Sequence, residues 1–155
     1  MYTTRVTRHI AAPASEVYAA LVDADAVARW RVPRNMTAAV HEFDARVGGR
    51  VRISLTYDDL EARGKTSAHT DTYSGRFLEL TPEVRTVEEV EFESTDSALA
   101  GTVTVTTRLT PDGDGTMVEL VQEGMPDAVP PSDNELGSRM ALDALAEYVE
   151  GRLRH

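Results

Sequence analysis

The chain contains no cysteine, and this absence excludes several classes of chemistry at once. Without thiols there is no disulfide framework, no thiolate metal site and no cysteine nucleophile. A reducing compartment suits such a chain, so we expect the protein in the cytoplasm. No stretch approaches the roughly 18 consecutive apolar residues of a membrane span. The N-terminal segment lacks the unbroken apolar run of a secretory signal.

Basic residues are scarce, with 16 Lys and Arg against 26 Asp and Glu, which gives a formal net charge of -10. The few cations are scattered along the chain, and such a surface repels nucleic acid and anionic membranes. We therefore expect neither of these partners. The length of 155 residues is enough for one domain with a core of its own, so we expect a single domain over residues 1–155.

Hydrophobic periodicity divides the chain into three parts. An alternating segment at the N-terminus runs into Pro13, and residues 14–30 carry apolar side chains at helical spacing, which predicts two short helices. From residue 36 to 123 the period changes to two, and about six alternating segments are separated by polar turns. Because these turns are too short to hold crossover helices, the sheet should be antiparallel.

The last segment predicts a long amphipathic helix. Ser132 and Glu135 have the spacing of a capping box, and a broad apolar stripe follows. The stripe consists of Leu136, Met140, Ala141, Ala144, Leu145, Tyr148, Val149 and Leu153. The predicted order is β-α-α-β×6-α, an α+β fold in which a curved antiparallel sheet of about seven strands wraps around the C-terminal helix. We expect a cavity where the helix and the sheet do not quite meet.

Six short motifs in this order resemble the helix-grip superfamily of START, polyketide-cyclase and birch-pollen-allergen-like proteins. The motifs are IAAPASEVYAAL, ARW with Pro33, FDARVGGRVR, YSGRFLEL with Pro82, VELVQEGMP and ELGSRMALDALAEYV. Within the superfamily, the sequence is most similar to the activator-of-heat-shock-protein-90-ATPase homologues, of the single-domain bacterial type. The resemblance implies a helix-grip fold, and the wider superfamily contains lipid carriers, hormone receptors and ring-closing enzymes.

Two positions depart from the pattern of that family. Members often carry paired tryptophans where this chain has Trp30-Arg31, and Gly-Trp where it has Gly137-Ser138. The loss of both aromatic side chains predicts a more open or differently shaped cavity.

The favoured hypothesis is a protein that binds a small hydrophobic or amphipathic molecule in its cavity, with no cofactor. The expected cavity residues are Trp30, Tyr57, Tyr73, Phe77, Phe92, Gln122 and Met140. Two of them leave alternatives open. Trp30 either stacks on the ligand or plugs a helix–sheet junction, and the latter is favoured. Gln122 either contacts the ligand or anchors the turn that follows its strand.

A first rival hypothesis is an enzyme of cyclase or dehydratase type. His69, Asp71 and Tyr73 share one strand face and could act in acid–base catalysis if they faced a cavity. A solvated strand is the favoured interpretation of the same residues. The histidines have no metal-binding spacing, so no metal site is predicted.

A second rival hypothesis is a chaperone-modulating module, as the family name implies. The sequence also leaves open whether the protein forms a homodimer.

Glycines at two positions raise structural questions. Gly48-Gly49, with arginines nearby, lacks the Lys-Ser/Thr and the following helix of a phosphate loop, so a hairpin turn is favoured. A two-residue loop would bury charged side chains, so an odd-length loop such as Val47-Gly48-Gly49, with Gly49 left-handed, is predicted. It sets Ala45 and Phe43 beside Val51 and Ile53, and Asp44 outside, beside Arg52. Gly75 is expected to mark a bulge, because strict alternation cannot bury both Phe77 and the pair Leu78 and Leu80.

The run EEVEFE predicts an acidic outer face. In this interpretation Glu89, Glu91 and Glu93 point outward, and Val90 and Phe92 point into the core.

Overall fold

The computed structural model describes residues 1–58 and 70–153, and its elements follow the predicted order. Within these ranges, seven strands form one antiparallel sheet in the order β1-β7-β6-β5-β4-β3-β2. The strands are β1 (Tyr2–Ile10), β2 (Met36–Phe43), β3 (Arg50–Tyr57), β4 (Thr70–Thr81), β5 (Arg85–Phe92), β6 (Val103–Asp112) and β7 (Gly115–Met125). The helices are α1 (Ala14–Leu21), α2 (Ala24–Trp30), α3 (Pro131–Leu153) and the short 3-10 helix η1 (Ser97–Leu99).

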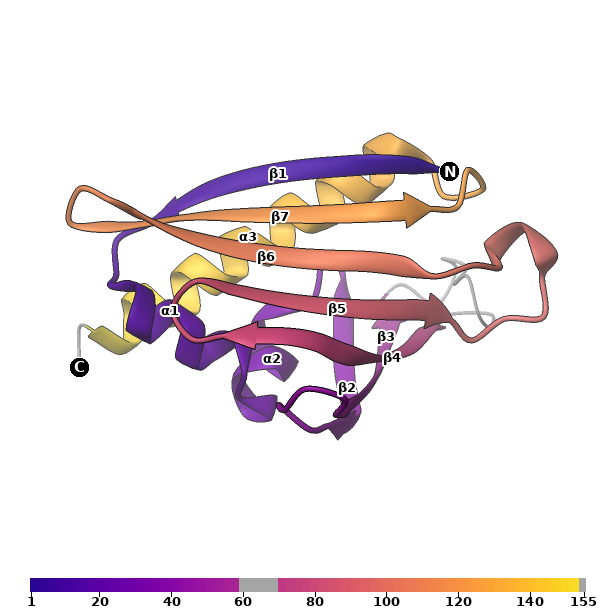
Figure 1. Ribbon diagram of the computed structural model, residues 1–155. Coiled ribbons are helices and arrows are strands. Elements are labelled where there is room, and N and C mark those ends of the chain that lie inside the picture. The colour runs from indigo at the N-terminus through magenta and orange to yellow at the C-terminus, as the bar shows by residue number, and fades with distance from the viewer. Residues whose placement is uncertain (59–69, 154–155) are drawn as a thin grey trace.

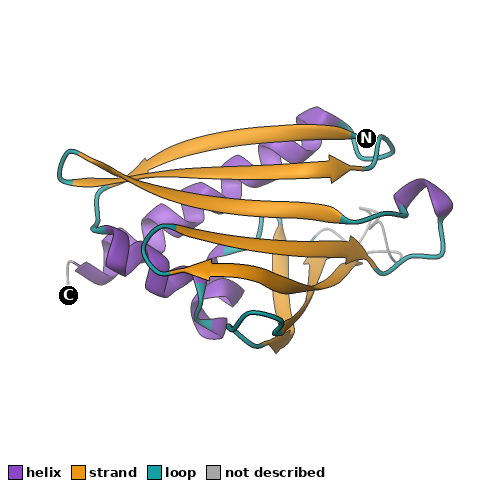
Figure 2. Ribbon diagram, viewed as in Figure 1, coloured by secondary structure: helices purple, strands orange, loops and turns teal. Residues whose placement is uncertain are grey.

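The long helix α3 crosses one face of the sheet, behind β1, β7 and β6 in Figure 1, and α1 and α2 lie beside its C-terminal half. Figure 2 shows that the helices gather on this one side, while the other face of the sheet is uncovered. The expected α+β helix-grip architecture is therefore confirmed. No helix in residues 1–58 and 70–153 is both long enough and apolar enough to cross a membrane.

The local sequence favours the starts of α2 and α3. Asp23 caps α2 by accepting a hydrogen bond from the backbone N–H of Asp25 at 3.1 Å. α3 begins at Pro131, whose missing N–H is harmless at a first helical position. Ser132 therefore lies inside the first turn, and the predicted cap at that residue is wrong.

The predicted apolar stripe of α3 is only partly correct. The buried positions are Ser138, Leu142, Leu145, Ala146 and Val149. Leu136 and Leu153, at the two ends of the predicted stripe, are exposed. The buried face of α3 is therefore rotated from the predicted stripe toward Ser138. A search for apolar periodicity does not include this residue, because it is polar.

The turn between β2 and β3 is longer than predicted. Gly48, not Gly49, has the positive φ of 83°, and residues 44–49 form the connection. A Cβ on Gly49 would lie 1.9 Å from the carbonyl oxygen of Asp44, so this glycine serves a close backbone approach instead. Phe43 faces Val51 in the ladder, which is the predicted side of the sheet although the register differs by two residues.

The bulge of β4 lies at Leu78, not at Gly75 as predicted. Phe77 is buried and Leu78 is exposed, so the extra residue allows Leu80 to pack against the core together with Phe77. Gly75 has a different role, because a Cβ there would lie 1.8 Å from the carbonyl oxygen of Glu89 on β5. The sequence indicated the need for a bulge, while the packing against β5 decided its place.

Candidate functional site: an internal cavity

A cavity of about 570 Å³ lies between the sheet, the end of α2 and the N-terminal half of α3. This volume falls in the range of about 300–1,000 Å³ that is typical of small-molecule sites. About half of the wall residues are aliphatic, among them side chains from β3, β5, β6 and β7. These include Leu55, Val90, Val103, Val105, Leu120 and Met125.

Six of the seven predicted cavity residues line this space. They are Trp30, Tyr57, Tyr73, Phe92, Gln122 and Met140. The seventh, Phe77, is only 1% exposed and is not part of the wall. Its ring meets that of Phe43 edge to face at a centroid distance of 5.5 Å, so it belongs to the core of the sheet. That the six wall residues contact a ligand stays a prediction.

Trp30 closes the junction between α1 and α2. Its indole Nε1–H donates to the carbonyl oxygen of Ala20 at 2.8 Å, which fixes the ring in place. The side chain is buried, yet part of it forms cavity wall. This hydrogen bond joins two helices, whereas the favoured prediction is a plug between a helix and the sheet. Because Trp30 also forms part of the wall, contact with a ligand stays a prediction.

Gln122 is held by α3 and not by the turn after β7. The Asn134 side chain donates from Nδ2 to Oε1 of Gln122, and Thr4 donates to Oδ1 of Asn134. This chain of hydrogen bonds ties β1, β7 and the first turns of α3 together at one end of the cavity. Gln122 thus borders the cavity as a braced polar group.

The most polar part of the wall is an ion pair that sequence reasoning did not find. Arg31 follows the last residue of α2, and its Nη1 donates to both carboxylate oxygens of Glu88 at 2.9 Å. The side chains of Arg31 and Glu88 are 16% and 4% exposed. The guanidinium carbon lies 5.4 Å from the centroid of the Tyr73 ring, which adds a cation–π contact.

The pKa values of Arg31 and Tyr73 are both raised, but for different reasons. Burial by itself would lower the pKa of Arg31, but the Glu88 carboxylate and Tyr73 outweigh it and raise the pKa further above its ordinary value. The pKa of the Tyr73 hydroxyl is raised, first by burial and then by the charge of Glu88, against the opposing effect of Arg31. At neutral pH this part of the wall presents a guanidinium and a neutral phenol.

Asp71 and Tyr73 both face the cavity, so the favoured interpretation of a solvated strand is wrong. Asp71 is 3% exposed, and both residues form part of the wall. The sheet curves so that this face of β4 turns inward, which alternation alone could not show. His69, the third catalytic candidate, lies outside the described residues.

The position of Glu88 on the cavity wall could have been predicted from the sequence. Strict alternation in β5 places Glu88 on the same face as Val90 and Phe92, and all three line the cavity. The run of acids around it drew attention to the outer face, where Glu89, Glu91 and Glu93 lie as predicted. Arg31 carried a weaker signal, as a cation where similar proteins often have a tryptophan.

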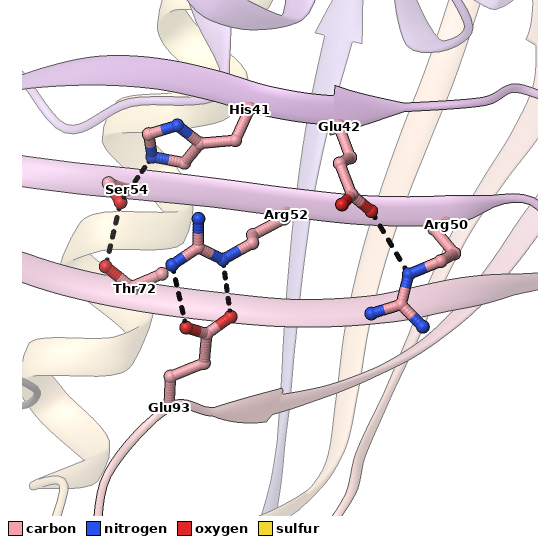
Figure 3. A network of polar contacts seen from close by, with 7 residues as sticks. All are labelled: His41, Glu42, Arg50, Arg52, Ser54, Thr72 and Glu93. Atoms are coloured by element: carbon pink, nitrogen blue, oxygen red, sulfur yellow. Dashed lines mark hydrogen bonds and ion pairs between the residues drawn. The ribbon is translucent and has the colours of Figure 1, made fainter.

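The polar side chains on either side of the Gly48-Gly49 turn lie on the outer face of the sheet, and residues 41–54 do not line the cavity. Figure 3 shows its polar network, in which Arg50 pairs with Glu42 and Nε2 of His41 lies 2.8 Å from Oγ of Ser54. Asp44 points outward, as predicted, but it pairs with Arg46 at 2.6 Å and not with Arg52. Over the part of the chain that the structure describes, no three His, Asp or Glu side chains gather to hold a metal ion.

Solved structures share this architecture. A protein from Chromobacterium violaceum is 36% identical, with a TM-score of 0.84 and 96% of each chain covered. A protein from Rhodobacter sphaeroides is 22% identical with a TM-score of 0.76, over 96% of this chain and 93% of its own. An AHSA1-like protein from Aeromonas hydrophila is 19% identical with a TM-score of 0.74, over 97% and 94%.

No curated protein matches the sequence. The family model for "Activator of Hsp90 ATPase homolog 1-like protein" matches residues 11–150, which include both short helices, β2 to β7 and nearly all of α3. The chain therefore belongs to the activator of Hsp90 ATPase homologue 1-like family.

Proposed function

We propose that the protein binds a small hydrophobic or amphipathic molecule in its internal cavity. The observation that carries the proposal is a cavity of about 570 Å³ whose wall is mainly aliphatic and aromatic, with a few braced polar groups. Apolar burial supplies the affinity in such a site, and the polar groups set the orientation of the ligand. Arg31, Tyr73 and Gln122 are the polar groups best placed to do this.

Binding can be followed through the single tryptophan, Trp30, which forms part of the cavity wall. A panel of neutral and charged aliphatic, aromatic and polyketide-like compounds would be titrated against Trp30 fluorescence and thermal unfolding. A ligand that occupies the cavity should change the fluorescence and raise the melting temperature. Absence of any response across the panel would contradict the proposal.

Two matched methionine variants show whether the ligand enters the cavity. Met140→Phe places a larger ring in the wall, whereas Met117, also half-buried, lies on β7 outside the cavity. We expect Met140→Phe to weaken binding about tenfold by filling space, and Met117→Phe to leave it unchanged. Equal effects of the two substitutions would mean that the ligand binds elsewhere.

One observation favours a second candidate function, acid–base catalysis on a bound ketone. Asp71 and Tyr73 meet the condition that they face the cavity. The Asp71 carboxylate would take a proton from the carbon beside a carbonyl group, and the protonated Tyr73 hydroxyl would hydrogen-bond to the resulting enolate oxygen. This is the first step of an aldol-type ring closure.

The test is exchange of that proton for deuterium in D₂O, followed by NMR on an apolar ketone that binds. We expect the exchange to be faster with the protein than in buffer alone. We expect Asp71→Asn to lose this acceleration while it still binds the ketone. Exchange at the rate of buffer alone would exclude this step and would leave the ligand-binding proposal untouched.

A further inference from the structure

Charged groups of both signs border the cavity. Among the described wall residues there is one guanidinium, that of Arg31, and the carboxylates are those of Glu88, Asp71 and Asp133. Asp71 and Glu88 are buried, whereas Asp133 is exposed in the first turn of α3. A ligand carboxylate therefore finds no second guanidinium among the described wall residues to balance its charge.

Arg31, the one cation among the described wall residues, is already neutralised by Glu88. Both oxygens of Glu88 accept from one nitrogen of Arg31, and the two side chains are almost enclosed. A ligand carboxylate beside Arg31 would add a second negative charge to a pair that needs none, and buried excess charge is strongly unfavourable.

A neutral acceptor avoids this cost and can still use the guanidinium. Arginine carries five N–H donors on three nitrogens. Glu88 takes its hydrogen bonds from Nη1 alone, and Tyr73 is the other side-chain hydrogen-bond partner of Arg31, so two partners leave donors over for a ligand. A carbonyl oxygen can accept a hydrogen bond from this group without changing the charge of the cavity. The Tyr73 ring on the guanidinium gives an apolar neighbour to the rest of the ligand.

We propose that the cavity selects uncharged amphipathic molecules that carry a carbonyl-type acceptor, held by Arg31, and that it discriminates against carboxylates with the same apolar part. This rests on the proposed function, because it names the class of ligand for the same cavity. Glu88 is then a specificity-determining residue, since its charge decides what the guanidinium accepts.

The experiment compares three ligands with one apolar chain at pH 7: decanamide, decanoate and decylammonium. Calorimetry and Trp30 fluorescence would give their affinities below the concentrations at which they form micelles. We expect decanamide to bind at least tenfold more tightly than decanoate. Decanoate binding as tightly as decanamide, or decylammonium binding most tightly of the three, would overturn the inference. If none of the three binds while other apolar compounds do, the inference also fails.

Glu88→Gln removes the charge and nearly keeps the shape of the side chain. With Arg31 left without a counter-charge, we expect decanoate to gain at least tenfold relative to decanamide. Glu93→Gln is the matched control, because Glu93 also pairs with an arginine, Arg52, but on the outer face of the sheet. An unchanged ratio in folded Glu88→Gln, or the same change in both variants, would contradict the role of Glu88.

The outcomes separate this inference from the proposed function. If no compound of the wider panel binds, the ligand-binding proposal itself fails. If compounds bind and the carboxylate is preferred, the cavity is a binding site and only the selectivity for neutral ligands is wrong. The ligand comparison in the unmodified protein needs no variant, so it decides the matter even if Glu88→Gln does not fold.

Discussion

Two Arg–Glu pairs with similar contact distances lie on opposite faces of the sheet. Arg31 and Glu88 meet at 2.9 Å beside the cavity, and Arg52 and Glu93 form two contacts of 2.8 and 3.0 Å on the outer face. The inner pair is nearly enclosed, whereas the side chains of the outer pair are 40% and 34% exposed. The surroundings, and not the contact distances, distinguish the two pairs.

The comparison shows that the same type of contact has different consequences in buried and in exposed surroundings. Exposed pairs lose most of their attraction to solvent screening and contribute little stability. A buried pair gains little net stability either, because both ions lose their hydration, but removal of one partner leaves a charge that nothing compensates. The inner pair therefore limits which charged groups can enter the cavity, while the outer pair, between β3 and the residue after β5, contributes little.

The largest effect on stability is expected from substitutions that compare the packing of side chains on the two faces of the sheet. Phe77→Ala removes a ring that is fully buried on the inner side, and we expect a loss of about 4 kcal/mol in the free energy of unfolding. Leu78→Ala, at the next residue, changes an exposed side chain at the bulge and should be close to neutral. Urea denaturation of both variants checks this. Similar losses for the two would mean that the bulge does not separate the faces.

The next effect concerns the inner ion pair. Glu88→Leu leaves the Arg31 guanidinium buried without its partner, and we expect a loss of about 3 kcal/mol in unfolding free energy. The double variant Arg31→Met/Glu88→Leu removes both charges and should recover most of that loss. Chemical denaturation of the single and double variants gives the coupling between the two side chains. A double variant no more stable than Glu88→Leu would rule out charge as the reason.

The smallest effect is expected at the outer pair, and it depends on pH. Hydrogen bonds from Arg52 lower the pKa of Glu93 below its ordinary value. A carboxyl group whose pKa is lowered by folding stabilises the folded state above its unfolded pKa, and this stabilisation is lost as the pH falls through the lowered value.

The melting temperature of Glu93→Gln should therefore lie slightly below that of the unmodified protein at pH 7. The difference should shrink progressively below about pH 5, and at pH 7 it should shrink in high salt. Thermal unfolding at several pH values and two ionic strengths measures it. A gap that stays constant in acid would show that Glu93 acts through packing and not through charge.

Alternation in the sequence was a sound guide to the faces of the strands. It placed Val90 and Phe92 inward and the neighbouring acids outward, and it put Phe43 on the inner side of β2. It was a poor guide to turns and register, because the length of the turn after Phe43 depends on how close two backbone segments approach at Gly49. Sequence patterns do not record such contacts between segments.

The candidate site was predictable in outline and not in its chemistry. The aromatic wall residues Tyr57, Tyr73 and Phe92 could be named because large side chains on inward positions of a curved sheet must face the helix or the space beside it. The ion pair could not, since Arg31 and Glu88 are 57 residues apart and lie in elements of different type. The sequence around each residue does not indicate which oppositely charged side chain will be its partner.

The sequence by itself determined the order and type of the elements and the inward side of most strands. The reason is that periods of two and 3.6 are local consequences of backbone geometry. Only the tertiary structure decided that Asp71 is enclosed and that Arg31 finds Glu88, and it alone left a cavity of about 570 Å³ beside them. Those features depend on the curvature of the sheet and on the placement of α2 and α3 over it, which many distant contacts set together.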